Sequence, residues 1–131
     1  LLAMAMGCDM VNVGRTAMFS IGCIQSQRCH TGRCPTGVAT QSPWLEHGLD
    51  PALKSVRCAN YIATLRFELL SLARACGRVH PSLVPLDALE LLDVDLETIR
   101  VDRLFGYEPD WGLPSPADVE AITALMTLGD G

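Results

Sequence analysis

Residues 9–14 (DMVNVG) constrain the fold more than any other part of the sequence, because they are the one segment whose pattern convincingly predicts a β-strand. The segment is short and mostly apolar, and it lies between two segments predicted to be helical, residues 1–7 and 16–22. Such a strand is typical of a parallel sheet covered by helices, and parallel strands need neighbours from other βα units. The sequence offers no such neighbours and begins at Leu1 within an apolar stretch. We therefore expect residues 1–22 to be the closing α-β-α piece of a larger α/β domain.

Composition excludes several classes of protein. Of the 131 residues, 49% are hydrophobic and 19% are charged, which excludes an intrinsically disordered chain. No apolar run approaches the ~18 residues that span a bilayer, and no basic segment precedes an apolar one near the start. The net charge of -5 hides an excess of basic residues before residue 81 and of acidic residues after it, but the arginines do not cluster with aromatic residues. We expect a soluble, cytoplasmic protein that binds neither membranes nor nucleic acid.

The rest of the chain divides into a loop and a mainly helical region. Residues 23–48 contain Gly and Pro breakers without sustained periodicity, which predicts a loop. A long helix follows: Asp50 is a good N-cap, Pro51 suits the first helical position, and Gly77 provides the stop. Beyond it the sequence predicts a short helix over 85–92, an extended piece over 98–101 and a last helix over 115–128. The chain is thus divided into residues 1–22, 23–48 and 49–131.

The turn at Gly14, Arg15 and Thr16 is a candidate phosphate site. A glycine at the end of a parallel strand lets the backbone approach a ligand closely, and the helix that follows directs free N–H groups and its positive dipole end outward. In a (β/α)8 barrel the loops after the last two strands commonly bind phosphate, and Arg15 would add a forked, charged donor. A simple turn beside a solvated arginine is the alternative.

Cys23, Cys29 and Cys34 form the second chemical signal, a C-x5-C-x4-C-P pattern. Three thiolates on a loop rich in breakers suit a soft metal centre, and a cysteine followed by proline is typical of iron–sulfur proteins. The arginines of the loop would lower the thiol pKa values and balance the charge of a cluster. Zinc with His30 as a fourth ligand is one alternative, although zinc ligands usually pair about two to four residues apart. Three buried cysteines without a metal are the other.

The remaining cysteines are expected to be packing residues. Cys58 and Cys76 lie on one predicted helix, about 27 Å apart at a rise of about 1.5 Å per residue, which is beyond disulfide reach. Nothing marks the chain as secreted, so the cysteines indicate a reducing, cytosolic compartment. His47 and His80 are expected to be ordinary surface residues.

The stretch DMVNVGRTAMFSIGCIQSQRCHTGRCPTGVATQ, residues 9–41, resembles the C-terminal part of the FMN-binding domain of the glutamate synthase family. The cysteine spacing followed by Pro-Thr-Gly-Val-Ala-Thr-Gln is highly specific to that family. The later segments PSLVPLDALELL and FGYEPDWGLPSPAD are similar to the tail of its shorter members, which lack an amidotransferase domain. The resemblance favours the iron–sulfur interpretation over the two alternatives.

The resemblance implies a split (β/α)8 TIM barrel that holds FMN. This chain would supply the last strand and helix, a cluster-binding loop and a mainly helical tail. It also implies that Cys23, Cys29 and Cys34 ligate a 3Fe-4S cluster. The motif offers three thiolates, whereas a four-iron cubane needs four protein ligands, so the number of cysteines fits the three-iron form. Cys8 precedes the predicted strand, at the barrel end opposite the phosphate turn, and is not expected to be a fourth ligand.

The resemblance further implies an oxidoreductase that makes L-glutamate. In the family the turn after the last barrel strand contacts the FMN phosphate, which implies that role for Gly14 and Arg15. Electrons from a ferredoxin or an NAD(P)H-oxidising subunit pass through iron–sulfur centres to FMN, which reduces 2-iminoglutarate formed from 2-oxoglutarate and glutamine-derived ammonia. No catalytic residue is named, because the substrate-binding residues would lie upstream of Leu1, and the isolated chain is expected to be inactive. A non-catalytic iron–sulfur electron-transfer module and a structural zinc module are the alternatives.

Overall fold

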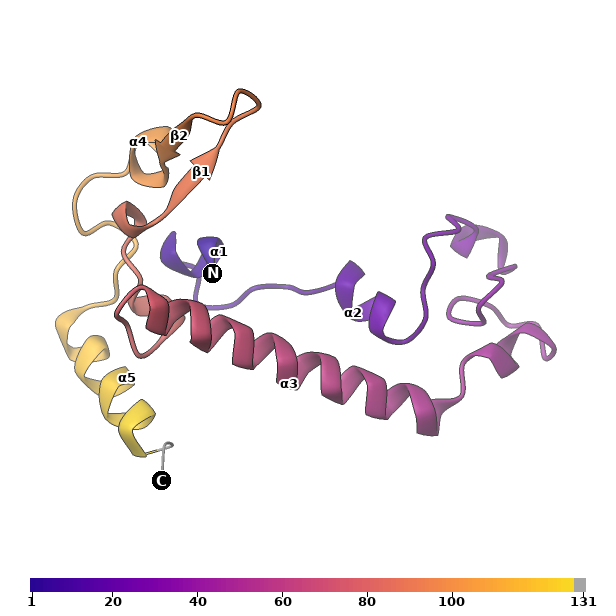
Figure 1. The fold of residues 1–131 in the computed structure, drawn as a ribbon. Coiled ribbons are helices and arrows are strands. Elements are labelled where there is room, and N and C mark those ends of the chain that lie inside the picture. Colours follow the sequence, from indigo (N-terminus) through magenta and orange to yellow (C-terminus); the bar gives the residue numbers. More distant parts are fainter. Residues whose placement is uncertain (129–131) are drawn as a thin grey trace. The chain divides into compact units, whose positions relative to one another are not determined.

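The computed structural model describes residues 1–128 and shows a chain of mixed helix and strand that divides into two compact units. The terminal unit consists of Leu1–Val11 together with the chain from Phe67 onward, and the central unit is Asn12–Arg66. The long helix α3, the longest ribbon in Figure 1, contributes residues to both. Among the described residues, no helix is long and apolar enough to cross a membrane.

The described elements follow one another in a mostly helical order with one late pair of strands. They are α1 (Leu2–Ala5), α2 (Arg15–Ser20), the 3-10 helices η1 (Cys29–Thr31) and η2 (Leu45–Gly48), α3 (Pro51–Ala75), the 3-10 helices η3 (Pro81–Leu83) and η4 (Leu86–Ala88), β1 (Glu90–Leu92), β2 (Thr98–Arg100), α4 (Val101–Phe105) and α5 (Pro116–Leu128).

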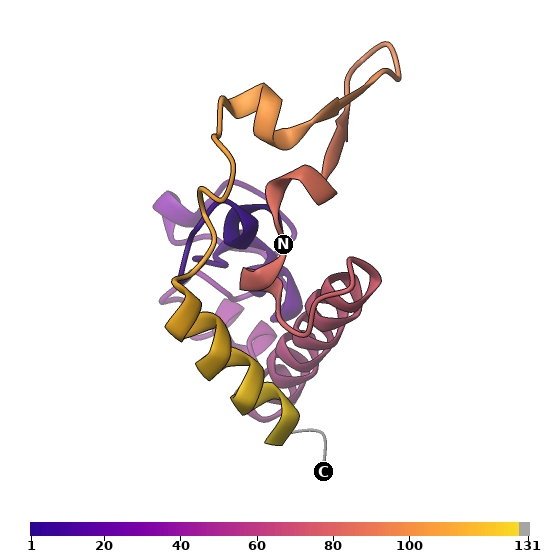
Figure 2. The ribbon, with the colours of Figure 1, turned by 90° about the vertical axis from the view of Figure 1, so that its left-hand side faces the viewer.

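The hydrophobic core lies in the terminal unit. It is built from α1, the end of α3, and the chain from η3 to α4, which includes the β1–β2 hairpin (Figure 2). The Tyr107 hydroxyl donates a hydrogen bond to the carbonyl oxygen of Met6 at 3.2 Å and so joins the two ends of the chain that make up this unit. The buried members of the core are Ala5, Ala73, Val84, Leu86 and Val101.

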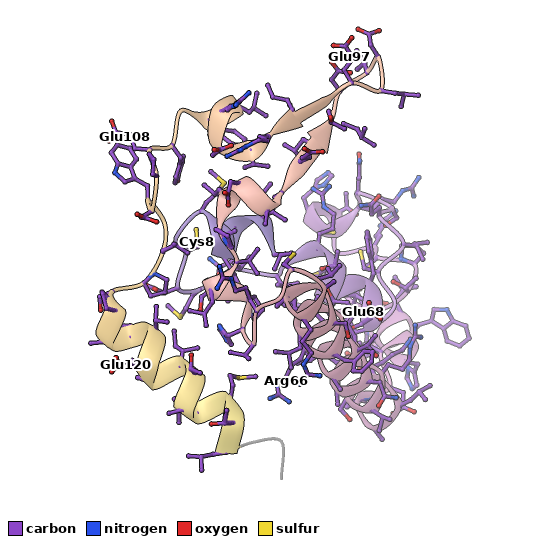
Figure 3. All side chains as sticks on the ribbon, turned by 60° about the vertical axis from the view of Figure 1, so that its left-hand side comes forward. Cys8, Arg66, Glu68, Glu97, Glu108 and Glu120 are labelled. Carbon is purple, nitrogen blue, oxygen red and sulfur yellow. The ribbon has the colours of Figure 1, made fainter. Side chains whose placement is uncertain are left out.

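The sequence predicts a helix over residues 85–92, but only the short 3-10 helix η4 forms there. The residues after η4 form β1, the first strand of a β-hairpin, so the helix prediction was wrong for them. Strands β1 and β2 pair antiparallel, with Leu91 opposite Ile99. Asp93 starts the turn, and its carboxylate accepts a hydrogen bond at 3.0 Å from the N–H of Glu97, which lies at the hairpin tip in Figure 3. An aspartate that bonds backbone donors in this way favours a turn over a continuing helix. The extended piece predicted over 98–101 is confirmed as β2.

Arg100 and Asp102 form an ion pair at the base of the hairpin. Arg100 donates from Nε and Nη2 to the two carboxylate oxygens of Asp102 at 3.0 and 2.6 Å, and Asp87 lies 3.9 Å from Nη2. The hydrogen bonds from Arg100 are the main cause that lowers the pKa of Asp102 below its ordinary value of 3.8. The same contact raises the pKa of Arg100.

Replacing Arg100 by methionine should remove an acid-sensitive contribution to the stability of the terminal unit. The folded-state pKa of Asp102 lies below its unfolded value, so the pair contributes fully above about pH 4 and loses its contribution as the pH falls through the folded-state pKa. An NMR titration should show the pKa of Asp102 returning toward 3.8 in the variant. Arg78→Met removes an arginine that does not act on Asp102 and should leave this titration unchanged. A wild-type titration in Arg100→Met would contradict the pairing.

Local signals fix both ends of α3, as predicted. The carboxylate of Asp50 accepts a hydrogen bond from the N–H of Ala52 at 3.0 Å, which caps the N-terminus. At the other end Gly77 adopts a φ of +71°, and the N–H of Arg78 donates to the carbonyl oxygen of Ala73 at 2.9 Å. This is the glycine stop that the sequence predicts.

An Asp50→Ala change should fray the first turn of α3. The free N–H groups of that turn lose their side-chain acceptor, at an expected cost of about 1 kcal/mol. Far-UV circular dichroism of a peptide spanning residues 48–77 should show lower helix content. Asp50→Asn keeps an acceptor and should retain the helix. Equal helix content in the two variant peptides would contradict the cap.

Residues 9–14, predicted to be a strand, are not one in this structure. The segment has no regular secondary structure and pairs with no strand, and the sheet of the described residues consists of β1 and β2 alone. Met10 is 90% exposed and Val11 50% exposed. A single extended segment cannot form ladder hydrogen bonds without a neighbour, which explains the missing strand.

The apolar stripe of α3 is also only partly covered. Leu53, Val56 and Ile62 remain exposed, whereas Leu65 and Leu69 are half-buried. Helical periodicity predicted the helix correctly, but it does not say what the apolar face packs against.

Candidate metal centre

Cys34 is the only buried side chain of the central unit. Its exposed fraction is 4%, and the one other buried residue of Asn12–Arg66, every residue of which is described, is Gly37. Folded proteins normally bury a cluster of apolar side chains that contact one another. The central unit instead buries a thiol.

The buried thiol lies within the turn that the sequence Cys-Pro-Thr-Gly forms. The N–H of Gly37 donates to the carbonyl oxygen of Cys34 at 3.2 Å, which closes a β-turn with proline in its second position. The turn brings Thr36 back toward Cys34, with Oγ1 3.4 Å from Sγ. The main-chain N–H groups of Thr36, Val38 and Ala39 also favour the thiolate and lower the pKa of Cys34.

These donors stabilise the thiolate form of Cys34. The hydrogen bond from Thr36 is the largest cause and that from the N–H of Ala39 the next, and together they lower the pKa of Cys34 from 9.0 to about 7 although burial opposes them. The thiolate is the form that binds metal ions. The surroundings of Cys34 therefore favour the thiolate, which is a soft, anionic metal ligand.

Two glycines hold this turn against the chain that precedes α3. Gly37 has a φ of +79°, and a Cβ there would overlap the carbonyl oxygen of Leu45. A Cβ at Gly48 would lie 2.6 Å from the carbonyl oxygen of Thr36. Main-chain segments can approach this closely only where side chains are absent. The glycines thus fix the backbone that carries the Thr36 hydroxyl.

Cys29 and Cys23 belong to the same loop but are less buried. Cys29 is exposed and lines a shallow pocket together with Val38 and Ala39, two residues that also bond the sulfur of Cys34. Cys23 follows α2 and is half-buried. Among the described residues, no group of three or more Cys, His, Asp or Glu side chains lies close enough together to hold a metal ion. The three predicted ligands are therefore near one another in sequence but not gathered into one group.

The donor set nevertheless fits an iron–sulfur cluster in its chemistry. All three residues are free thiols on one loop, and the best buried of them is surrounded by N–H and O–H donors. Hydrogen bonds to the ligand sulfurs are a general feature of iron–sulfur sites. His30, the fourth ligand of the zinc alternative, is exposed on η1.

The other cysteines and histidines lie mostly as expected. Cys8, labelled in Figure 3, lies three residues after the end of α1 and is exposed, so the expectation that it is a packing residue was wrong. Cys58 is half-buried on α3, and Cys76 packs against the core. His47 is exposed. His80 was wrongly expected to be an ordinary surface residue: it is half-buried, its Nδ1 accepts from the N–H of residue 82 at 3.2 Å, and burial lowers its pKa.

Gly14 and Arg15 lie at the start of α2, as the phosphate hypothesis requires. Gly14 is the N-cap, and a Cβ there would meet no atom within 4 Å. Arg15 is the first helical residue and is exposed. The Tyr61 hydroxyl donates to Oγ1 of Thr16 at 2.7 Å and thereby attaches this turn to α3. The turn is open to a ligand, and its contact with phosphate stays a prediction.

Three residues that contact the cysteine loop were not predicted from the sequence. Thr36 could have been found from the turn signal, since proline in the second position and glycine in the fourth place it beside the cysteine. Gly48 could not have been found, because nothing in the sequence indicates that it contacts a turn that ends eleven residues earlier. Lys54 could not either: its Nζ lies 2.8 Å from the place of a Cβ at Gly22, beside the first cysteine of the motif.

Comparison with known proteins decides the family. A family model of a conserved region in glutamate synthase matches residues 1–79 of the chain. The chain belongs to the glutamate synthase family. The matched region contains Gly14, Arg15 and the three cysteines of the loop. No solved structure matches the chain.

Curated relatives of this family member come from bacteria and archaea. A glutamate synthase large subunit-like protein, YerD of Bacillus subtilis, is 40% identical over 103 residues, which are 79% of this chain and 20% of the relative. The archaeal-type glutamate synthase [NADPH] of Thermotoga maritima is 33% identical over 106 residues, 81% of this chain and 19% of the relative. The archaeal glutamate synthase [NADPH] of Methanocaldococcus jannaschii is 43% identical over 75 residues, 57% and 15% of the two chains. The chain thus spans about a fifth or less of the length of these relatives.

Proposed function

We propose that this chain is part of an iron–sulfur flavoprotein oxidoreductase that makes L-glutamate, and that its loop of three cysteines binds a 3Fe-4S cluster. The observation that carries the proposal is the burial of Cys34 among hydrogen-bond donors in a unit that buries no other side chain. A buried thiolate with this many donors is poorly explained by apolar packing, whereas it is what a cluster ligand requires.

The central unit needs a bound metal group to stabilise its fold. Its one buried side chain cannot supply the apolar contacts that stabilise a folded unit of this length. Small metal-binding units commonly gain their folding free energy from the metal instead. Cys23 and Cys29, which lie on the same loop, are the ligands that would join Cys34 around such a group.

The start of α2 is the proposed contact with the phosphate of FMN. The free N–H groups of the first helical turn, the open space at Gly14 and the positive charge of Arg15 are suited to a phosphate group. When bound, the cluster and FMN would supply the electron transfer for the reductive formation of L-glutamate from 2-oxoglutarate and ammonia.

The exposed residues 9–14 are the proposed last strand of a TIM barrel. The segment carries apolar side chains at Met10, Val11 and Val13, all of which are exposed in this chain. Such side chains are normally covered by helices and neighbouring strands. Residues 1–22 would complete the barrel, and the tail from residue 49 would pack outside it.

The electron donor is proposed to be an NAD(P)H-oxidising subunit or a ferredoxin. Two of the relatives carry NADPH in their names, which favours the first of these. Catalytic residues of the reaction are not assigned to any position of this chain.

Cofactor analysis of the full-length protein tests the proposal. We expect anaerobically purified protein to contain iron, acid-labile sulfide and FMN, and to form glutamate from 2-oxoglutarate and ammonia when supplied with a reductant. Zinc without iron or sulfide would establish a structural zinc module instead. A cluster without a flavin requirement would establish an electron-transfer module.

A further inference from the structure

Among the described residues, the hydroxyl of Thr36 is the one side-chain donor that contacts the sulfur of Cys34. Its Oγ1 lies 3.4 Å from Sγ, within hydrogen-bond reach for sulfur, and either atom could donate in the free thiol. A sulfur bound to a metal carries no proton, so in the loaded protein only the threonine can donate. Metal binding therefore gives this hydrogen bond a fixed direction.

The surroundings prevent water from taking over this role. Cys34 is 4% exposed, so a lost donor at this sulfur could not easily be replaced by solvent. The backbone of Thr36 is held by the close approach of Gly48 to its carbonyl group, and the turn is closed by the N–H of Gly37. The backbone of Thr36 is thus positioned by main-chain contacts and not by the sulfur itself.

We infer that Thr36 donates a hydrogen bond to the cluster-bound sulfur of Cys34 and thereby raises the reduction potential of the cluster. The inference rests on the proposed function, since it requires a cluster at the three cysteines. Reduction adds negative charge to a cluster and its ligands, so a donor at a ligand sulfur stabilises the reduced state more than the oxidised one. Thr36 is a positioning and tuning residue that acts through Cys34.

Thr36→Val in the full-length protein is the test, because valine keeps the branched shape and removes the donor. We expect a roughly tenfold less favourable one-electron reduction, a potential lower by about 59 mV, in a redox titration followed by EPR. Thr36→Ser keeps a hydroxyl and should restore the wild-type potential. Thr31→Val is the matched control: it removes a threonine hydroxyl of the same loop whose hydrogen bonds are to the carbonyl oxygen of Arg28 and from the N–H of Arg33, not to a cysteine sulfur. Its potential should stay at the wild-type value.

The possible results separate this inference from the function on which it rests. A protein without iron and sulfide overturns the proposed function and the inference together. A cluster whose potential is unchanged in Thr36→Val, or equally lowered in Thr36→Ser, overturns the inference alone. If Thr36→Val loses its cluster, the rate of iron release to a chelator decides in place of the potential: slow release from Thr36→Ser supports the hydroxyl donor, and fast release from Thr36→Ser refutes it.

Discussion

Cys34→Ser should abolish cluster binding by the full-length protein. Serine removes the thiolate, which is the ligand form, and leaves a hydroxyl group that is a harder and weaker ligand for iron. Because changes to residues that only support a metal ligand already cost about 10- to 100-fold in metal affinity, we expect loss of a ligand to lower bound iron and sulfide by at least about tenfold. Iron and acid-labile sulfide analysis, together with the loss of the cluster's visible absorbance, checks the result.

The same outcome is expected for Cys23→Ser and Cys29→Ser, because three thiolates are all that the motif provides. Cys58→Ser is the matched control, since Cys58 is a half-buried cysteine of the same unit that lies on α3 outside the loop. It should retain its cluster. A cluster that survives in Cys34→Ser but is lost in Cys58→Ser would show that the ligands have been assigned to the wrong cysteines.

Gly37→Ala should unfold the turn that holds Cys34. The new Cβ would overlap the carbonyl oxygen of Leu45 and lie 3.0 Å from the main-chain nitrogen of Leu49, so the backbone must move. Such overpacking costs about 1–3 kcal/mol, and an alanine in the left-handed region costs about 1–2 kcal/mol more. We expect faster proteolysis of the loop and loss of bound iron.

Gly32→Ala separates the two causes. Gly32 lies in the same loop with a similar φ of +68°, but a Cβ there meets no atom within 4 Å. This variant bears the cost of the left-handed conformation without the clash, and it should retain most of its iron. Equal losses in Gly32→Ala and Gly37→Ala would mean that backbone conformation alone, and not the contact with η2, holds the turn.

The ends of α3 and the start of α5 could be predicted because their signals are local. The Asp50 cap, the Gly77 stop and the pairing of Ser115 with Asp118 at the start of α5 each involve residues within a turn of one another. The Ser115 hydroxyl accepts from the N–H of Asp118 at 3.3 Å, as the capping pattern predicts. Interactions of this range act in the same way whatever the rest of the fold does.

The strand predicted over residues 9–14 and the helix predicted over residues 85–92 failed for two different physical reasons. Residues 9–14 have the composition of a buried strand, but a strand exists only through hydrogen bonds to a neighbour, which the described residues do not supply. Residues 90–92 have apolar spacing that also fits a helix, and the turn at Asp93 together with the pairing to β2 decided in favour of the hairpin. In both cases the deciding partner lies outside the local segment.

The sequence by itself determined the family resemblance, the three candidate ligands and the helices α3 and α5, because ligand spacing and helix caps are properties of neighbouring residues. Only the tertiary structure decided that Cys34 is the buried thiol and that Thr36 and Gly48 lie beside it. Burial and close approach are set by segments brought together from different parts of the chain, and Gly48 meets the carbonyl of Thr36 only because the loop closes on η2. Sequence spacing predicted a metal centre, and folding determines which sulfur is stabilised as its thiolate.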